Sequence, residues 1–171
     1  MKSSLLPVLT TMGLFAFLGL VKTNAELNVG DSVPAATVQD HQGKEVKLTE
    51  ACAKGLVLVY FYPKADTPGC TKQACSLRDA DAALKEKGVK IYGVSFDTVE
   101  AQKKFAEKFN LTFPLLADPE GKVVKAFGVP ATGSFAKRQA YLFKDGKLVW
   151  RDLAAATDKQ AADVLEAVKK L

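Results

Sequence analysis

Residues 56–88 read LVLVYFYPKADTPGCTKQACSLRDADAALKEKG, and the pattern changes partway along this stretch. Its first seven residues, Leu56–Tyr62, are all apolar or aromatic and rich in strand formers, which indicates a strand buried on both faces. After Asp66-Thr67-Pro68-Gly69 interrupts the run, apolar residues recur at three- and four-residue spacing from Cys70 to Lys87. This spacing predicts a helix that ends at Gly88, a residue suited to a left-handed cap.

Strand and helix patterns alternate along the rest of the chain. We expect strands at 90–96 and 113–117, helices at 99–109, before Phe127 and at 159–170, and hairpins from 36–39 with 45–48 and from 139–143 with 148–151. The segment 128–137, with Pro130 and two glycines, is expected to be a mobile loop. Such alternation is typical of parallel pairing. The sequence therefore predicts a three-layer α/β domain with a mixed sheet whose last two strands are antiparallel.

The first 25 residues have the layout of a secretory signal peptide. Lys2 precedes an apolar run, Leu14–Val21, which is followed by Thr23-Asn24-Ala25 as a small-residue exit. A membrane-spanning helix needs about 20 predominantly apolar residues, so an uncleaved anchor is the less favoured alternative. We expect cleavage after Ala25, export to a periplasm rather than the medium, and a mature domain over residues 26–171 without stable membrane association.

Charge and cysteine content narrow the class of protein. The net charge of +5 falls to about +3 without the leader, and the lysines are spread along the chain, which argues against nucleic-acid binding. Three cysteines allow one disulfide and leave one thiol over. A domain of this size does not need a disulfide for stability. We therefore expect any disulfide to take part in a reaction rather than to stabilise the fold.

Cys70 follows the predicted buried strand and falls in the first turn of the next helix. Open α/β sheets place ligands at the carboxyl ends of their strands. If Thr67 is the N-cap, Pro68 takes the first helical position that it favours, and unpaired backbone N–H groups surround Cys70. Such a position favours the thiolate, the form of cysteine that acts as a nucleophile. Attack on a peroxide would give a sulfenic acid, which a second thiol must capture before further oxidation.

Cys75 is the candidate for that second thiol, and its spacing has a physical consequence. Residues five apart on a regular helix have Cα atoms about 8.6 Å apart, whereas a disulfide needs about 7 Å or less. The start of the helix must therefore unwind during each turnover if Cys70 and Cys75 pair.

The segment YFYPKADTPGCTKQACSLRD resembles the active-site segment of the peroxiredoxin Q subfamily, also called bacterioferritin comigratory protein. It carries the peroxiredoxin pattern Pro-x-x-x-Thr-x-x-Cys as Pro63, Thr67 and Cys70, and the subfamily's second cysteine as Cys75. Arg138, before QAYLF and a DGK turn, resembles the family's active-site arginine. The similarity runs from about Gly30 to the C-terminus, although GVPATGSFAKR replaces a tryptophan-containing segment common before the arginine.

The resemblance implies a thioredoxin-like fold and a role for each matching residue. Cys70 would be the peroxidatic nucleophile and Cys75 the resolving thiol. Thr67 would hydrogen-bond the peroxide, Arg138 would stabilise the thiolate and the developing oxygen charge, and Pro63 would shield the site from water.

The expected reaction is reduction of hydrogen peroxide or an alkyl hydroperoxide, with the resulting disulfide recycled by a thioredoxin-like protein. Such an antioxidant enzyme needs no metal, haem or flavin, and we expect a monomer.

Two other functions fit the sequence less well. A disulfide oxidoreductase typically uses Cys-x-x-Cys, whereas four residues separate Cys70 from Cys75. A non-catalytic exported domain with a structural disulfide is the second alternative.

Cys52 is expected to pack as a small hydrophobic residue. His41 is the only histidine, which makes a zinc site or a cysteine protease improbable.

Overall fold

The computed structural model of the chain describes residues 26–171. The predicted signal peptide, residues 1–25, lies outside the described residues. Within 26–171, no helix has both the length and the apolar character needed to cross a membrane.

Seven strands form one mixed sheet in the order β2-β1-β5-β4-β3-β8-β9. Their bounds are β1 Thr37–Asp40, β2 Glu45–Lys47, β3 Leu56–Phe61, β4 Val89–Ser95, β5 Leu115–Ala117, β8 Gln139–Lys144 and β9 Lys147–Asp152. The strands β3, β4 and β5 are parallel to one another, whereas β8 is antiparallel to both β3 and β9. The predicted mixed sheet with antiparallel final strands is therefore confirmed.

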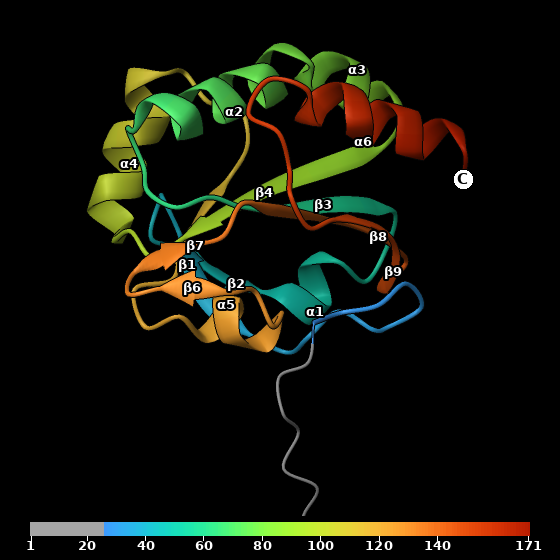
Figure 1. Cartoon of the computed structure of the whole chain (residues 1–171), viewed down its shortest axis with the longest axis horizontal. Helices are drawn as coiled ribbons and strands as arrows, with labels where there is room; N and C mark the ends of the chain where they lie inside the picture. Colours follow the sequence, from blue (N-terminus) through green and yellow to red (C-terminus); the bar gives the residue numbers. More distant parts are fainter. Residues whose placement is uncertain (1–25) are drawn as a thin grey trace, which may run out of the picture.

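Helices cover both faces of this sheet, which gives three layers (Figure 1). Their bounds are α1 Leu48–Ala51, α2 Pro68–Asp79, α3 Asp81–Glu86, α4 Val99–Lys108, α5 Lys122–Ala126 and α6 Gln160–Lys169. Helices α2, α3, α4 and α6 pack on one face, and α1 and α5 pack on the other. The sequence did not predict α1, a single turn before β3.

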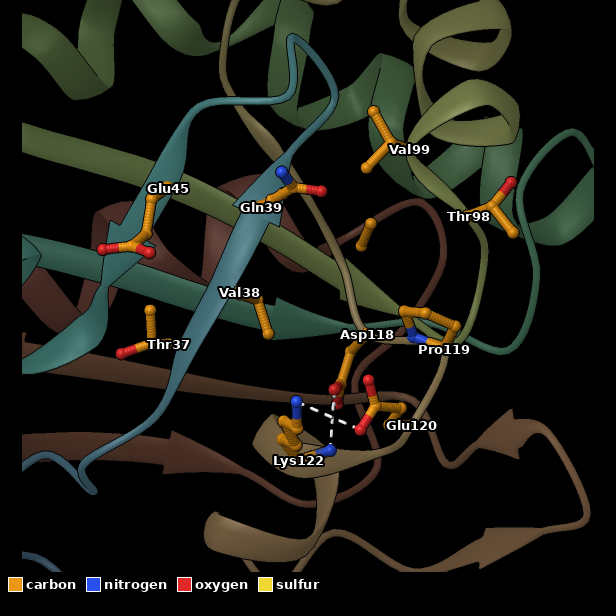
Figure 2. Close-up of a pocket in the computed structure, with 11 residues that line it drawn as sticks. Thr37, Val38, Gln39, Glu45, Thr98, Val99, Asp118, Pro119, Glu120 and Lys122 are labelled. Carbon is orange, nitrogen blue, oxygen red and sulfur yellow. Dashed lines mark hydrogen bonds and ion pairs between the residues drawn. The ribbon is translucent and has the colours of Figure 1, made fainter.

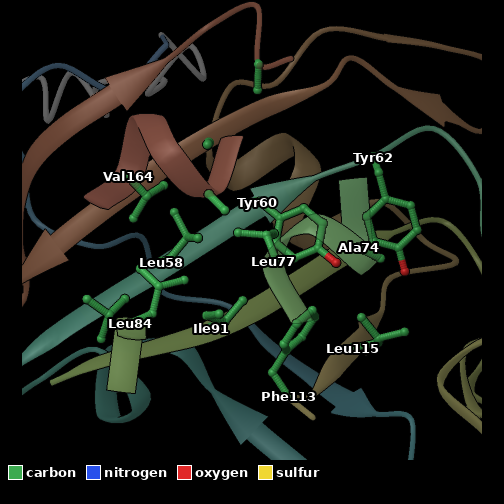
Figure 3. Close-up of a cluster of buried hydrophobic side chains, with 14 of the residues drawn as sticks. Leu58, Tyr60, Tyr62, Ala74, Leu77, Leu84, Ile91, Phe113, Leu115 and Val164 are labelled. Atoms are coloured by element: carbon green, nitrogen blue, oxygen red, sulfur yellow. The ribbon is translucent and has the colours of Figure 1, made fainter. Parts of the chain in front are cut away.

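The central strand β3 is buried on both faces, as its apolar run predicts. Side chains alternate along a strand, so Leu58 and Tyr60 enter the core beneath α2, while Val57 and Val59 enter the core on the opposite face. All four are fully buried. Figure 3 shows Leu58 and Tyr60 packed with residues of α2, α3 and α6. The sheet and α2 thus share one continuous core, which fixes where α2 begins.

The helix expected from Cys70 to Lys87 is two helices, and that prediction was wrong in this respect. Ala80 lies between α2 and α3 with φ −92° and ψ −1°, away from the ψ near −42° of a regular helix. This changes the direction of the chain and lets α3 pack against β4. Gly88, at φ +75°, has the left-handed conformation that the sequence predicted.

The segment 128–137, expected to be a loop, contains a small hairpin of its own. Strands β6 Ala131–Thr132 and β7 Phe135–Ala136 pair outside the main sheet, with Gly133 between them at φ +58°. A positive φ at a turn is a conformation that glycine adopts without strain. The hairpin leads directly into Arg138 and β8.

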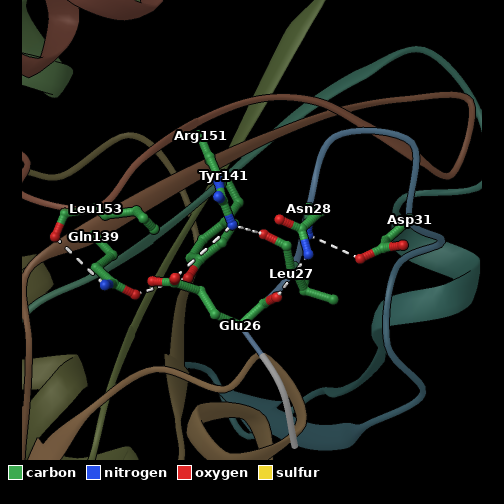
Figure 4. Close-up of polar contacts among 8 residues, drawn as sticks. All are labelled: Glu26, Leu27, Asn28, Asp31, Gln139, Tyr141, Arg151 and Leu153. Carbon is green, nitrogen blue, oxygen red and sulfur yellow. Dashed lines mark hydrogen bonds and ion pairs between the residues drawn. The ribbon is translucent and has the colours of Figure 1, made fainter.

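The first described residues are attached to the edge of the sheet. Arg151 of β9 donates a hydrogen bond to the backbone oxygen of Leu27 and lies 3.9 Å from the Glu26 carboxylate (Figure 4). Next to it, Tyr141 donates to Gln139 at 2.7 Å, and Gln139 donates to the backbone oxygen of Leu153 at 3.4 Å. These bonds fix the first residues of β8, which immediately follow Arg138.

Candidate active site

Four of the five candidate site residues lie where β3 ends and α2 begins, and the fifth, Arg138, comes from a distant part of the sequence. Strand β8 runs antiparallel to β3 with Gln139 opposite Phe61, so the start of β8 meets the end of β3. This register places Arg138 beside the first turn of α2. The sheet therefore brings together residues that are 68 positions apart, Cys70 and Arg138.

Cys70 lies in the first turn of α2 and is 2% exposed. Thr67 is the N-cap position with an extended backbone, and Pro68 is the first helical residue, as predicted. The Thr71 N–H donates to the Thr67 oxygen at 2.8 Å, whereas the N–H groups of Gly69 and Cys70 precede any acceptor within the helix. The free N–H groups at the start of α2 and the positive end of the helix dipole therefore lie near the Cys70 sulfur.

Arg138 makes the closest charged contact with the thiol. Its Nη2 lies 3.4 Å from Cys70 Sγ, and its Nη1 donates to Gln73 Oε1. A guanidinium group has donors only and stays charged at all relevant pH values, so it stabilises a thiolate rather than a neutral thiol. The same group can also stabilise negative charge on an oxygen atom that approaches the sulfur.

Thr67 lies at the expected N-cap position of α2. Its hydroxyl does not cap α2; instead Oγ1 donates to the backbone oxygen of Lys64 at 2.9 Å. This bond uses the hydroxyl hydrogen and leaves the oxygen lone pairs as acceptors. The half-buried Thr67 can therefore accept a hydrogen bond from a hydroperoxide O–H.

Pro63 is half-buried and lines a pocket of about 260 Å³ next to the site. Phe96 of the loop after β4 and Phe135 of β7 line the same pocket, so the hairpin of 131–136 forms one of its walls. Phe135 is 51% exposed, and the Lys64 ammonium lies 6.0 Å from its ring centroid. Both an apolar surface and a cation thus line this pocket beside Pro63.

Cys75 is part-exposed and lies on the same helix as Cys70, and both are free thiols. Arg78, one turn further on, is held by Asp79 and by the backbone oxygen of Phe109, at 2.6 Å. The hydrogen bond that Arg78 donates to Asp79 is the largest cause that raises the pKa of Arg78, and the neighbouring Cys75 raises it further. Cys75 is therefore accessible and has a cation nearby.

Cys52 lies outside this site, as expected. It is fully buried in the core on the opposite face of the sheet, where burial raises the pKa of its thiol to about 12. A thiol with such a pKa stays protonated and unreactive at neutral pH. Cys52 therefore acts as a small apolar side chain.

Sequence reasoning missed one residue of the site, Gln73. Its side chain is fully buried on the core face of α2, one turn after Cys70, and its carbonyl oxygen accepts from Arg138. The available signal was a glutamine in the helical stripe formed by Cys70, Ala74 and Leu77, where an apolar residue is the rule. A buried amide in such a stripe must find a polar partner.

A pocket of about 500 Å³ lies elsewhere, between β1, the start of α4 and the start of α5 (Figure 2). Its buried acid, Asp118, accepts from the backbone N–H groups of Lys122, Val123 and Val124 at 2.7 to 2.9 Å. Burial raises the pKa of Asp118, and these three bonds oppose that shift. The carboxylate is committed to capping α5, so this pocket lacks the chemistry that surrounds Cys70.

Comparison with known proteins agrees with the geometry. The model of the AhpC/TSA family matches residues 29–151. The chain is similar to chloroplastic peroxiredoxin Q of Populus jackii, with 42% identity over 120 residues that cover 69% of this chain and 56% of that protein. The chain thus spans only about half the length of such curated relatives.

Two solved structures have the same fold. Peroxidoxin BcpB of Mycobacterium tuberculosis has 32% identity and a TM-score of 0.79, over 85% of this chain and 99% of that one. A bacterioferritin comigratory protein of Xanthomonas campestris, with alkyl peroxide reduction activity, has 25% identity and a TM-score of 0.76, over 84% and 96%. The predicted thioredoxin-like fold is confirmed by these matches.

Proposed function

This chain belongs to the AhpC/TSA family, as a peroxiredoxin of the Q subfamily, and we propose that it reduces peroxides through Cys70. The observation that carries the proposal is the 3.4 Å contact between Arg138 Nη2 and Cys70 Sγ at the start of α2. A permanent cation and a helix N-terminus meet at one buried sulfur, which is the environment of a reactive thiolate.

The first step is attack of the Cys70 thiolate on one peroxide oxygen. The S–O bond forms as the O–O bond breaks, Cys70 is oxidised to a sulfenic acid, and the other oxygen leaves as an alcohol or as water after gaining a proton. Arg138 stabilises the charge that moves from sulfur to oxygen, and Thr67 accepts a hydrogen bond from the substrate. Pro63 limits the access of water to the sulfur.

The second step is capture of the sulfenic acid by Cys75. Its sulfur attacks the Cys70 sulfur, a disulfide forms, and the sulfenic oxygen leaves as water. Both cysteines lie within regular α2, where positions five apart have Cα atoms about 8.6 Å apart. That separation exceeds what a disulfide tolerates, so the first turns of α2 unwind before the bond closes.

The same site supports a proposal for the class of substrate and for the type of reductant. The pocket beside Pro63 offers the apolar Phe96 and Phe135 to an organic tail, which supports alkyl hydroperoxides as well as hydrogen peroxide. A dithiol protein of the thioredoxin type would restore the two thiols by exchange through the part-exposed Cys75. We propose that the enzyme works as a monomer.

We also propose that the protein is exported. Residues 1–25 have the composition of a secretory leader, so we propose a periplasmic enzyme that begins at Glu26.

Replacement of single cysteines tests the peroxidase mechanism. Cys70→Ser should abolish peroxide consumption, because no other thiol lies beside Arg138. Cys75→Ser should still undergo the first oxidation but stall after about one turnover. Cys52→Ala is the matched control and should retain activity, measured as hydrogen peroxide consumption with a dithiol reductant. Full activity in Cys70→Ser would rule the mechanism out.

Hydrogen exchange followed by mass spectrometry tests the unwinding of α2. Amides at 71–75 should exchange at least about tenfold faster in the oxidised protein than in the reduced one, because local opening removes helical protection. Helix α4, residues Val99–Lys108, is the internal control and should not change. Equal exchange at 71–75 in both redox states, with the disulfide present, would contradict the idea.

The mass of the protein recovered from a periplasmic fraction tests export. The polypeptide should start at Glu26. Recovery of the full-length chain in the membrane fraction would instead support the uncleaved anchor.

A further inference from the structure

A row of buried amides links Arg138 to the C-terminal helix. Gln73 Nε2, on α2, donates to Gln160 Oε1 at 2.5 Å, and Gln160 is the first residue of α6. Both glutamines are fully buried. Because Gln73 Oε1 accepts from Arg138 Nη1, the hydrogen bonds run without a gap from the neighbourhood of the Cys70 sulfur to α6.

The chemistry of the three side chains fixes the direction of this row. A guanidinium group has donors only, so Gln73 must turn its carbonyl oxygen toward Arg138. Its NH₂ group is then available only to an acceptor, which Gln160 supplies with its own oxygen. The NH₂ group of Gln160 is left without a partner, although it is buried. Burying an unpaired donor is unfavourable, so the fold keeps this arrangement at a cost to its stability.

The residues just before α6 also pack against the first turns of α2. The Thr157 methyl group and Arg138 Nη2 both approach Gly69, at 3.5 and 3.4 Å from the position that a β-carbon there would take. Asp158 forms an ion pair with Lys72 at 3.1 Å, but both side chains are more than half exposed. Exposed pairs of this kind contribute little to stability, so the buried amide pair is the stronger of these two polar connections.

We propose that Gln160 is a positioning residue for the peroxidase reaction. It holds the amide of Gln73 in one orientation, and Gln73 in turn holds the Arg138 guanidinium against the Cys70 sulfur. The inference rests on the proposed function, because Arg138 matters only if Cys70 reacts. An apolar pair of similar shape at 73 and 160 would fill the same space without the unpaired buried donor of Gln160. It would remove only the acceptor of the half-buried Arg138, so packing alone does not account for two glutamines.

Two substitutions of nearly equal size separate positioning from packing. Gln160→Met removes the acceptor, whereas Gln160→Glu keeps a carboxyl oxygen that can accept from Gln73. The measured quantity is the second-order rate constant for oxidation of Cys70 by hydrogen peroxide in stopped flow, with thermal unfolding recorded for each variant. The Met variant should be slower by about tenfold to a hundredfold, because a misplaced charged group loses much of its effect. The Glu variant should stay within about threefold of the wild type.

Asp158→Asn is the matched control, since it alters the same segment without touching the row of amides. It should react at the wild-type rate. A folded Gln160→Met protein with the wild-type rate constant overturns the proposal, and so do equal losses in the Met and Glu variants.

If Gln160→Met does not fold, the double variant Gln73→Met/Gln160→Met places a matched apolar pair at the two positions. Positioning requires this protein to remain slow once folded, whereas a wild-type rate would show that the glutamines only pack. If the wild-type protein did not react with hydrogen peroxide, the proposed function would be wrong. That result is distinguishable from failure of the positioning proposal, because it is measured on the wild-type protein alone.

Discussion

The contact between the Arg138 guanidinium and the Cys70 sulfur is the interaction on which the rest of the site depends. It exists because β8 runs antiparallel to β3, so the residue before β8 arrives where β3 gives way to α2. The buried strand β3 fixes the start of α2, and the polar bonds of Gln139 fix the start of β8. The sheet thus holds a half-buried cation beside a buried thiol.

Helix α2 has to satisfy two opposing demands. Under the proposed mechanism it must be intact to present Cys70 to Arg138, and it must open to let Cys75 reach the oxidised sulfur. Gln73 lies between the two cysteines, so opening of this segment also separates Gln73 from Arg138 and from α6. The bond from Arg78 to the Phe109 backbone oxygen attaches the far end of α2 to the end of α4. The opening can therefore stay local.

Much of this organisation was predictable from local patterns. The apolar run of β3, the Thr-Pro-Gly-Cys start of α2 and the Asp-Gly turn after β8 each specify their own structure. The break at Ala80 and the hairpin at 131–136 were not predicted. Packing against the sheet determines the break, and a short turn determines the hairpin. The amides of Gln73 and Gln160 were missed for another reason. Their partners are 87 residues apart, and no local spacing shows which buried polar groups will meet.

The rate at which reduced protein reacts with hydrogen peroxide, compared between the wild type and Arg138→Met, tests the central claim most directly. Stopped flow gives the second-order rate constant, and mass spectrometry of the trapped product locates the added oxygen. We expect a sulfenic acid at Cys70 in the wild type when it is trapped before Cys75 closes the disulfide. The variant should lose about 100-fold or more in rate, the typical effect of removing one such donor. Equal rate constants, or oxygen trapped on a different cysteine, would contradict the account.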